Sequence, residues 1–288
     1  MCEQDDFGGF AQARRGMTRR GFGAMAVGAS VAAALPRVAA AATKGSDVDI
    51  KTANGTCDAY FVRPEKGKHP GVLIWPDIFG LRPAFKEMAT RLAESGYAVL
   101  VVNPFYRTKH APTAPERPDF NDPPTRDALM TLMHSLNPQT TETDAKAFVG
   151  FLDQQLAVDT NRKIGTTGYC MGGPLVFRTA ATMADRIGAA ATFHGGSLVT
   201  DAPESPHLLI PKMKAQFLVA IAANDDEKDP KAKDTLREAF AQAKLPAEIE
   251  VYAGTKHGWC PTDSPVYDHD QAEKAWTRML EVFKRALV

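Results

Sequence analysis

The segment GYCMGG at residues 168–173 is the feature that most constrains the fold of this chain. It stands between a short apolar run at residues 163–167 and a helix-compatible stretch that begins at Pro174. A nucleophile between small residues, placed where a strand turns into a helix, is typical of a nucleophile elbow. The turn is so tight that Gly168 and Gly172, on either side of Cys170, must be nearly without side chains. The pattern therefore predicts a thiol nucleophile on a strand-to-helix turn.

The same segment has a structural interpretation, because cysteine is often a small buried apolar residue. The context favours the catalytic interpretation. The segment follows a strand-like run, a further glycine stands at Gly173, and an acid and a histidine follow later in the chain.

The charge of the chain is balanced. Its 288 residues carry 34 basic and 34 acidic side chains, so the formal net charge is zero. This balance gives no support for nucleic-acid binding, which usually leaves a basic excess. No apolar run in the body is long enough to cross a bilayer. We expect one α/β domain that acts on a small molecule, with no nucleic-acid partner and no membrane partner after export.

The first 42 residues have the layout of a secretory signal. Arg19 and Arg20 precede a weakly apolar stretch at residues 24–35, and small residues at 39–42 offer cleavage sites. Paired arginines indicate the twin-arginine export machinery as a partner. We therefore expect a signal peptide at residues 1–42, a mature domain at 43–288, and a periplasmic or extracellular location. The alternative is a disordered basic and alanine-rich tail.

Three cysteines would remain after such a leader is removed: Cys57, Cys170 and Cys260. If Cys170 is the nucleophile, Cys57 and Cys260 are the only candidates for a bridge in an oxidising compartment. Their separation in space cannot be read from the sequence, so the bridge stays open. No Cys-x-x-Cys or His-x-x-x-His pair is present, and we expect no metal.

The order of strands and helices predicts the fold class. Strands alternate with helices, which favours a mainly parallel twisted sheet with helices on both faces. Asn54 and Gly55 predict a hairpin and therefore an antiparallel N-terminal edge. Residues 103–138 are too long and too rich in proline for a plain connector, so we expect a cover over a site with a short helix at 129–136. Strands are expected at 47–52, 57–63, 71–75, 97–102, 163–167, 187–194, 215–222 and 247–252, and helices at 85–95, 143–156, 235–244 and 271–287.

The partners of a thiol nucleophile are a base and a group that orients the base. His257 lies in a glycine-flanked loop after an expected strand, and Asp225 or Asp226 lies in the loop after an earlier strand. Of the two acids, Asp225 is favoured and Asp226 is left as a turn or capping residue. The order nucleophile, acid, histidine is that of the α/β-hydrolases. All three positions fall at carboxyl ends of strands, where open α/β sheets place their active sites.

An oxyanion hole needs two backbone N–H donors. The residue after the nucleophile, Met171, and the loop residue Ile78 are the candidates. His194 also ends an expected strand and precedes two glycines, so it is the second choice as base and the expected floor of the site.

Four segments together resemble the dienelactone hydrolases, which are cysteine members of the α/β-hydrolase fold. They are WPDIFG at 75–80, GYCMGG at 168–173, AAND at 222–225 and YAGTKHGW at 252–259. The resemblance covers nearly all of the chain after the leader. It implies a triad of Cys170, Asp225 and His257, no metal and no organic cofactor. It also implies a carboxymethylenebutenolidase-type reaction, in which a lactone opens through an acyl-thioester.

The chain departs from the family pattern at two places. A glutamate that assists the thiol in well-known members is replaced by Asp77, which is one methylene shorter. An arginine that follows the histidine in those members is missing, and Trp259 stands there instead. Trp259 and His194 are candidates for contact with the substrate. Arg107 matches another carboxylate-binding arginine of the family, its neighbour Tyr106 is a second candidate for substrate binding, and Arg82 is a further one. We therefore expect a small ester or lactone as substrate. The alternatives are a ligand-binding scaffold without turnover and a redox-responsive protein that pairs Cys170 with Cys57 or Cys260.

Overall fold

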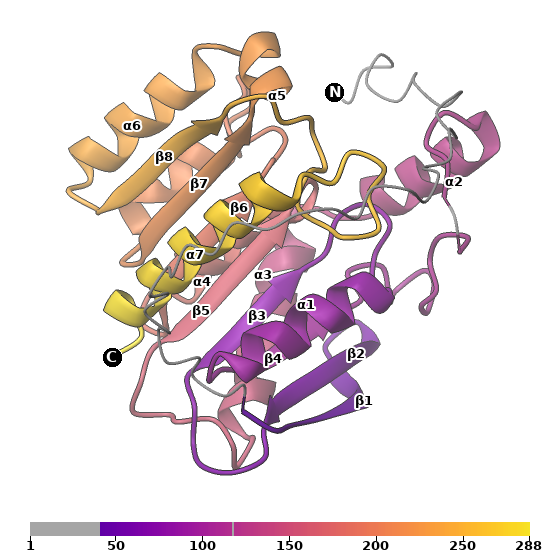
Figure 1. The fold of residues 1–288 in the computed structure, drawn as a ribbon, viewed down its shortest axis with the longest axis vertical. Helices are drawn as coiled ribbons and strands as arrows, with labels where there is room; N and C mark the ends of the chain where they lie inside the picture. Colours follow the sequence, from indigo (N-terminus) through magenta and orange to yellow (C-terminus); the bar gives the residue numbers. More distant parts are fainter. Residues whose placement is uncertain (1–40, 117) are drawn as a thin grey trace, which may run out of the picture.

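One sheet organises the computed structural model, which describes residues 41–116 and 118–288 (Figure 1). Within that part of the chain the sheet has eight strands in the order β1-β2-β4-β3-β5-β6-β7-β8. β1 pairs with β2 and β2 with β4 in antiparallel fashion, and all other pairs are parallel. The predicted fold class is confirmed. The strands are β1 Thr43–Thr52, β2 Gly55–Pro64, β3 Gly71–Trp75, β4 Ala98–Val102, β5 Ile164–Tyr169, β6 Ile187–Phe193, β7 Gln216–Ala222 and β8 Ala247–Tyr252.

The antiparallel edge is the hairpin that Asn54 and Gly55 predict. Thr52 is the register partner of Gly55, and the register runs on to Thr43 opposite Pro64. Gly55 has φ 138°, which only glycine adopts at little cost. The hairpin therefore forms as expected, although β1 begins four residues before the expected start at residue 47.

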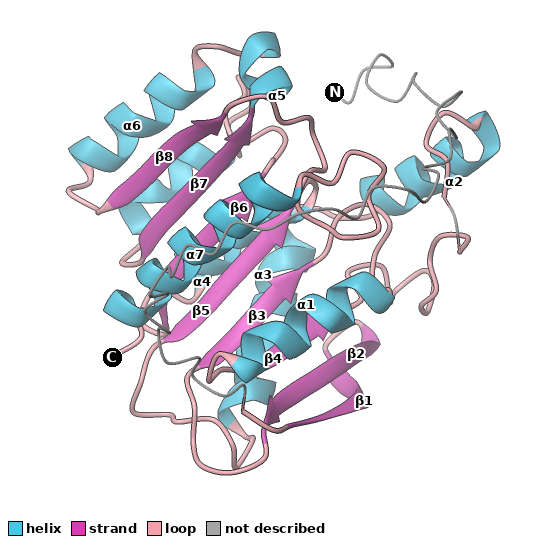
Figure 2. Cartoon of the chain, in the orientation of Figure 1, coloured by secondary structure: helices cyan, strands magenta, loops and turns pink. Residues whose placement is uncertain are grey.

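Helices cover both faces of the sheet, and each face has its own hydrophobic core (Figures 1 and 2). α1 (Pro83–Glu94) and α7 (His269–Ala286) lie on the near face, where Phe85 and Phe283 belong to one cluster. α3 (Pro138–Asp153), α4 (Gly172–Thr182) and α6 (Ala232–Gln242) supply side chains to the opposite cluster. Burying a side chain as large as Phe contributes about 1.5–3 kcal/mol.

The segment expected to cover a site holds a longer helix than the sequence predicts. α2 spans Pro123–His134, and the side chain of Asp122 accepts a hydrogen bond from the Thr125 N–H at 3.0 Å. The helix begins six residues before the expected position because proline is well tolerated in a first helical turn. α3 also begins early, where Asn137 and Thr140 form a capping box.

Two short helices were not expected. α5 (Ala223–Lys228) contains Asp225 and Asp226, which the sequence analysis places in a loop. A 3₁₀ helix spans Pro206–Lys212. α5 directly follows β7 and so lies at the carboxyl edge of the sheet, whereas the 3₁₀ helix lies in the connection that leads from β6 to the start of β7.

The leader expected at residues 1–42 lies outside the described residues except for its last two. Ala41 donates a backbone hydrogen bond to Glu94, and Ala42 accepts one from Glu65. No helix in the described part of the chain has the length and apolar character needed to cross a membrane.

Candidate active site

Cys170 stands on a strained turn between β5 and α4. Its φ is 52°, in the left-handed region that non-glycine residues rarely adopt. The backbone holds it there, since its N–H donates to the Phe193 carbonyl at 3.0 Å and its carbonyl accepts from the Gly173 N–H at 3.0 Å. A side chain at Gly168 would collide with the Gly172 carbonyl, and one at Gly172 would collide with the Trp75 carbonyl. The small flanking residues are therefore required by the backbone itself.

His257 and Asp225 meet beside the carboxyl ends of β7 and β8. His257 Nδ1 lies 2.8 Å from Asp225 Oδ2, and both side chains are partly buried. Asp226 points elsewhere and forms an ion pair with Lys233 at 2.6 Å. Of the two acids that the sequence leaves open, the structure brings only Asp225 to the histidine.

The electrostatic surroundings of His257 favour its charged form. Burial opposes protonation, but attraction to Cys170 and the hydrogen bond to Asp225 outweigh it, so the pKa of His257 lies well above its ordinary value near 6.5. Its Nε2 atom is buried and has no hydrogen-bond partner in the described part of the chain. One ring nitrogen is therefore held by the carboxylate, and the other remains available for proton transfer.

Two residues that the sequence analysis did not assign to the site hold this arrangement in place. Asn224 Oδ1 accepts a hydrogen bond from the backbone N–H of His257 at 2.8 Å. Thr255 Oγ1 accepts from the Ala223 N–H at 3.2 Å and donates to the Tyr252 carbonyl at 2.7 Å. Both residues stand inside the AAND and YAGTKHGW segments, and that position was the signal available for finding them.

His194 lies beneath His257 and is 1% exposed. The two rings are edge to face with their centroids 5.0 Å apart. Burial, reinforced by repulsion from His257, places the pKa of His194 well below 6.5, so this imidazole is neutral. Trp259 packs against the same ring at 5.1 Å and is itself fully buried. The structure therefore packs His194 and Trp259 together against the ring of His257, and Trp259, a candidate substrate contact in the sequence, is buried in the core.

The two expected oxyanion donors have free N–H groups. Neither Ile78 nor Met171 donates a backbone hydrogen bond within residues 41–116 and 118–288. The turn around Ile78 is held by its neighbours, because Phe79 N–H donates to Asp77 Oδ1 at 3.0 Å and Gly80 N–H to the Asp77 carbonyl at 2.9 Å. Asp77 therefore shapes the loop that carries Ile78.

Asp77 does not bond to the thiol as the resemblance implies. Its carboxylate accepts two hydrogen bonds from Arg82, at 2.6 and 2.9 Å. Arg82 also donates to Asp263 at 2.7 and 3.0 Å, which ties the loop after β3 to the segment before α7. The carboxylate and the guanidinium thus neutralise each other, and neither is free for the thiol or for a substrate.

Tyr106 and Arg107 are likewise bound to a buried carboxylate. Asp144, which is 2% exposed, accepts from Tyr106 Oη at 2.7 Å and from both terminal nitrogens of Arg107 at 2.7 and 2.8 Å. Thr52 lies 2.7 Å from the same tyrosine oxygen. The structure places this pair in a network that joins α3 to the β1–β2 hairpin.

The three cysteines of the described chain are all free. Cys57 and Cys260 are both buried, and they belong to the hydrophobic clusters on opposite faces of the sheet. The sheet separates them, so they do not form the disulfide that the sequence leaves open. Burial raises the pKa of both thiols and keeps them uncharged.

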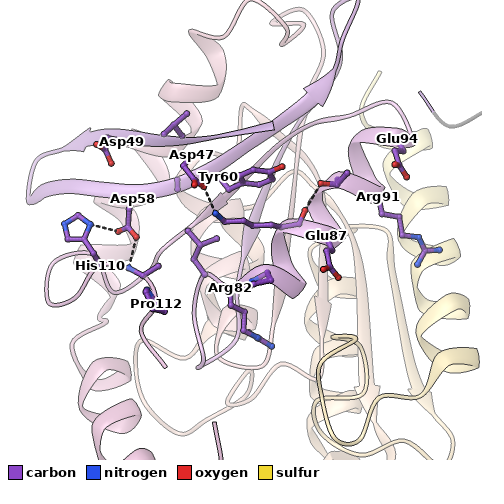
Figure 3. A pocket seen from close by; sticks show the side chains of 17 residues that line it. Asp47, Asp49, Asp58, Tyr60, Arg82, Glu87, Arg91, Glu94, His110 and Pro112 are labelled. Carbon is purple, nitrogen blue, oxygen red and sulfur yellow. Dashed lines mark hydrogen bonds and ion pairs between the residues drawn. The ribbon is translucent and has the colours of Figure 1, made fainter. Parts of the chain in front are cut away.

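One cavity lies away from Cys170, Asp225 and His257. It has a volume of about 890 Å³ and opens between the β1–β2 hairpin and α1 (Figure 3). Asp58, His110 and Lys86 line it, and so does Arg82, but Cys170, Asp225 and His257 do not. No group of three potential metal ligands occurs in the described part of the chain.

Comparison with known proteins agrees with the geometry of the elbow and the sheet. The model of the "Dienelactone hydrolase family" matches residues 57–287. The chain belongs to the dienelactone hydrolase family. Its fold is accordingly the α/β-hydrolase fold, with an antiparallel N-terminal edge.

Individual members of this family are distant relatives. A carboxymethylenebutenolidase of Rhodococcus opacus is 26% identical over 226 residues, which cover 77% of this chain and 84% of that protein. A Bradyrhizobium protein named "Probable 2-oxo-3-(5-oxofuran-2-ylidene)propanoate lactonase" is 26% identical over 238 residues, covering 81% and 91%. The metagenomic dienelactone hydrolase-like promiscuous phosphotriesterase P91 superposes with a TM-score of 0.70 at 23% identity, covering 86% and 100%. At that identity the superposition shows the shared fold alone.

Proposed function

We propose that this dienelactone hydrolase family member cleaves small esters or lactones through an acyl-thioester on Cys170. The observation that carries the proposal is the state of His257. Asp225 holds one ring nitrogen at 2.8 Å, the other is buried without a partner, and interaction with Cys170 raises the histidine pKa. A charged histidine beside a cysteine on an elbow is the arrangement that supports a thiolate nucleophile.

Acylation follows from these positions. The Cys170 sulfur attacks the substrate carbonyl carbon and forms a carbon–sulfur bond, while the carbonyl electrons move to the oxygen. The N–H groups of Ile78 and Met171 stabilise that oxyanion. The carbonyl re-forms as the carbon–oxygen bond to the alcohol breaks, and His257 Nε2 gives its proton to the leaving alkoxide. For a lactone, the released hydroxyl stays attached to the acyl chain.

Deacylation reverses these roles. Neutral His257 takes a proton from water, and the resulting hydroxide attacks the thioester carbon. The carbon–sulfur bond then breaks, the acid leaves, and Cys170 is again a thiolate beside a protonated His257. Asp225 orients the imidazole throughout and stabilises its positive charge.

The test is turnover of 4-nitrophenyl acetate and of simple γ- and δ-lactones by the purified protein. We expect Cys170→Ala to lower kcat by about 1,000-fold or more. Cys57→Ala is the matched control, because it removes a buried thiol in the hairpin core and should leave turnover unchanged. Equal turnover by wild type and Cys170→Ala would contradict the proposal.

The two other functions weighed from the sequence receive less support. A redox switch needs a partner thiol, but Cys57 and Cys260 are buried in separate clusters and all three thiols are free. A scaffold that only binds a ligand has no need for the strained Cys170 backbone or for a histidine held by Asp225. Slow alkylation of Cys170 at pH 6, unchanged in His257→Asn, would favour such a scaffold.

We propose in addition that residues 1–42 direct export by the twin-arginine route. The support is the layout of the sequence: Arg19 and Arg20, then a weakly apolar stretch, then small residues at 39–42. Replacement of both arginines by lysine should retain the protein in the cytoplasm of the expressing bacterium. N-terminal sequencing of the secreted form should give a start near Thr43, and export that does not depend on the arginines would contradict the proposal.

A further inference from the structure

Apart from His257, the side chains that pack around the candidate nucleophile are apolar. Cys170 contacts a small cluster of buried side chains formed by Phe105, Leu132 and Met171, with Met133 and Leu136 at its border. We call these five residues the thiol cluster. They come from three parts of the fold: the segment after β4, the end of α2 with the residues after it, and the elbow itself. An acyl group bonded to Cys170 would therefore lie beside hydrocarbon and thioether groups.

Arg82 is not available to bind a negative charge there. All three of its guanidinium nitrogens donate to carboxylates, at distances from 2.6 to 3.0 Å from Asp77 and Asp263. The side chains of Arg82 and Asp77 are only 13% and 8% exposed. If Arg82 turned toward a substrate, it would leave the buried Asp77 carboxylate without a cation, which is strongly unfavourable.

Arg107 is bound in the same way. Its terminal nitrogens form a two-pronged pair with Asp144, whose side chain is 2% exposed, and one of them also donates to Asn54 at 3.0 Å. The guanidinium lies over the ring of its neighbour Tyr106. Lys256 precedes His257 but is exposed to solvent, so its ammonium group lies outside the thiol cluster.

We infer that this site accepts a neutral, apolar acyl group and discriminates against substrates whose acyl chain carries a carboxylate. The inference rests on the proposed function and narrows its substrate class. The positive charge of His257 is already paired with Asp225 at 2.8 Å. A carboxylate next to the thiol cluster would therefore lose its hydration without gaining a paired guanidinium, and burial of an unpaired charge is costly. A methyl group at the same position would only exchange water for apolar contacts.

Three 4-nitrophenyl esters of one chain length separate charge from size. The hexanoate ends in a methyl group, the mono-adipate in a carboxylate, and the methyl adipate diester in a neutral ester group. The measurement is Cys170-dependent kcat/KM, taken as the difference between wild type and Cys170→Ala. We expect hexanoate to exceed mono-adipate by about 30-fold or more. Methyl adipate should lie close to hexanoate, because it is larger than mono-adipate but uncharged.

A charge introduced into the thiol cluster should reverse the preference. Leu132 is 7% exposed on α2, and Leu132→Lys places an ammonium group within reach of the acyl chain. We expect this variant to lower the hexanoate to mono-adipate ratio by about tenfold or more. Leu132→Gln is the matched control, since it is polar without charge, and it should lower turnover of hexanoate without improving that of mono-adipate. Thermal melting of both variants checks that each is folded.

The results distinguish the inference from the proposed function. Cys170-dependent hydrolysis that is equal for hexanoate and mono-adipate, or faster for mono-adipate, would overturn the inference and leave the hydrolase intact. Absence of Cys170-dependent hydrolysis of all three esters would overturn both. A rise in mono-adipate turnover in Leu132→Lys that does not occur in Leu132→Gln would support the inference.

Discussion

The ring of His194 lies edge to face with that of His257, with the centroids 5.0 Å apart, and neither nitrogen of His194 has a hydrogen-bond partner within the described residues. Two imidazoles this close cannot both be charged without strong repulsion. The pKa of the buried ring is depressed and that of the ring beside Asp225 is raised. The proton thus belongs to the histidine that faces the thiol.

The depressed pKa of His194 predicts a loss of stability in acid. In the unfolded chain His194 takes up a proton below its ordinary pKa near 6.5, but in the folded protein it does not. The free energy of unfolding therefore falls as the pH drops from 6.5 toward the lowered folded pKa. At pH 5 this loss of unfolding free energy should be smaller in His194→Phe than in wild type, by up to about 2 kcal/mol. Urea titrations from pH 5 to 8 measure it.

His257 changes the free energy of unfolding in the opposite direction as the pH changes. The His194→Phe variant must therefore be compared with wild type at each pH. Its raised pKa stabilises the folded protein below about 6.5, and that contribution is lost as the pH rises through the folded value. Because His194→Phe leaves His257 in place, the difference between the two titrations isolates His194. If the free energy of unfolding falls equally in both proteins below pH 6.5, His194 is not held neutral in the folded state.

The two neighbouring acids should differ sharply in their effect on turnover. Asp225→Asn leaves His257 Nδ1 without a carboxylate, so we expect kcat to fall by about 100- to 10,000-fold with little change in KM. Asp226→Asn breaks only the pair with Lys233 and should leave kcat nearly unchanged. Steady-state kinetics on 4-nitrophenyl acetate decides between the two acids, and a larger effect from Asp226 would reverse their assignment.

The elbow glycine should be intolerant of a side chain for a steric reason. A Cβ at Gly172 meets the carbonyl of Trp75, which is backbone and cannot turn away. We expect Gly172→Ala to lower the free energy of unfolding by about 3 kcal/mol. Gly150→Ala in α3 is the control, because its Cβ meets nothing within 4 Å and alanine favours a helix by about 0.5–1 kcal/mol. Chemical denaturation of both variants should show opposite signs, and a stable Gly172→Ala would contradict the close approach.

The pair between Arg82 and Asp77 should stabilise the loop that carries Ile78. Arg82→Met leaves the Asp77 carboxylate, whose side chain is 8% exposed, with no cation, and we expect a loss of about 3 kcal/mol. The double variant Asp77→Asn with Arg82→Met should recover part of that loss. Arg91→Met removes an exposed pair with Glu273 and should cost less than about 1 kcal/mol. If Arg82→Met and Arg91→Met lower the free energy of unfolding equally, the pair of Arg82 and Asp77 is effectively solvated, like the exposed pair of Arg91 and Glu273.

Local features of the sequence predict much of this molecule. The Asn54-Gly55 turn predicts the antiparallel edge because its geometry depends on two residues. The apolar run at 71–75 predicts a central strand, which is the fully buried β3. Cys170, Asp225 and His257 each follow the carboxyl end of a strand, and these ends meet at one edge of a parallel sheet.

Contacts between distant segments could not be predicted in the same way. Asp263 reaches Arg82 across 181 positions, and Asp144 reaches Arg107 across 37, so nothing near either arginine signals a partner. Both arginines consequently look like substrate anchors in the sequence and prove to be paired in the structure. The faces on which Cys57 and Cys260 lie likewise depend on the register of strands and loops far apart in the chain.

The most direct test of the thiol mechanism is mass spectrometry of the protein quenched in acid during turnover of 4-nitrophenyl acetate. The account predicts an acetyl thioester on the peptide that contains Cys170, which hydroxylamine removes and which Cys170→Ala does not form. An acetyl group on another residue, or release of 4-nitrophenol while Cys170 stays unmodified, would contradict it.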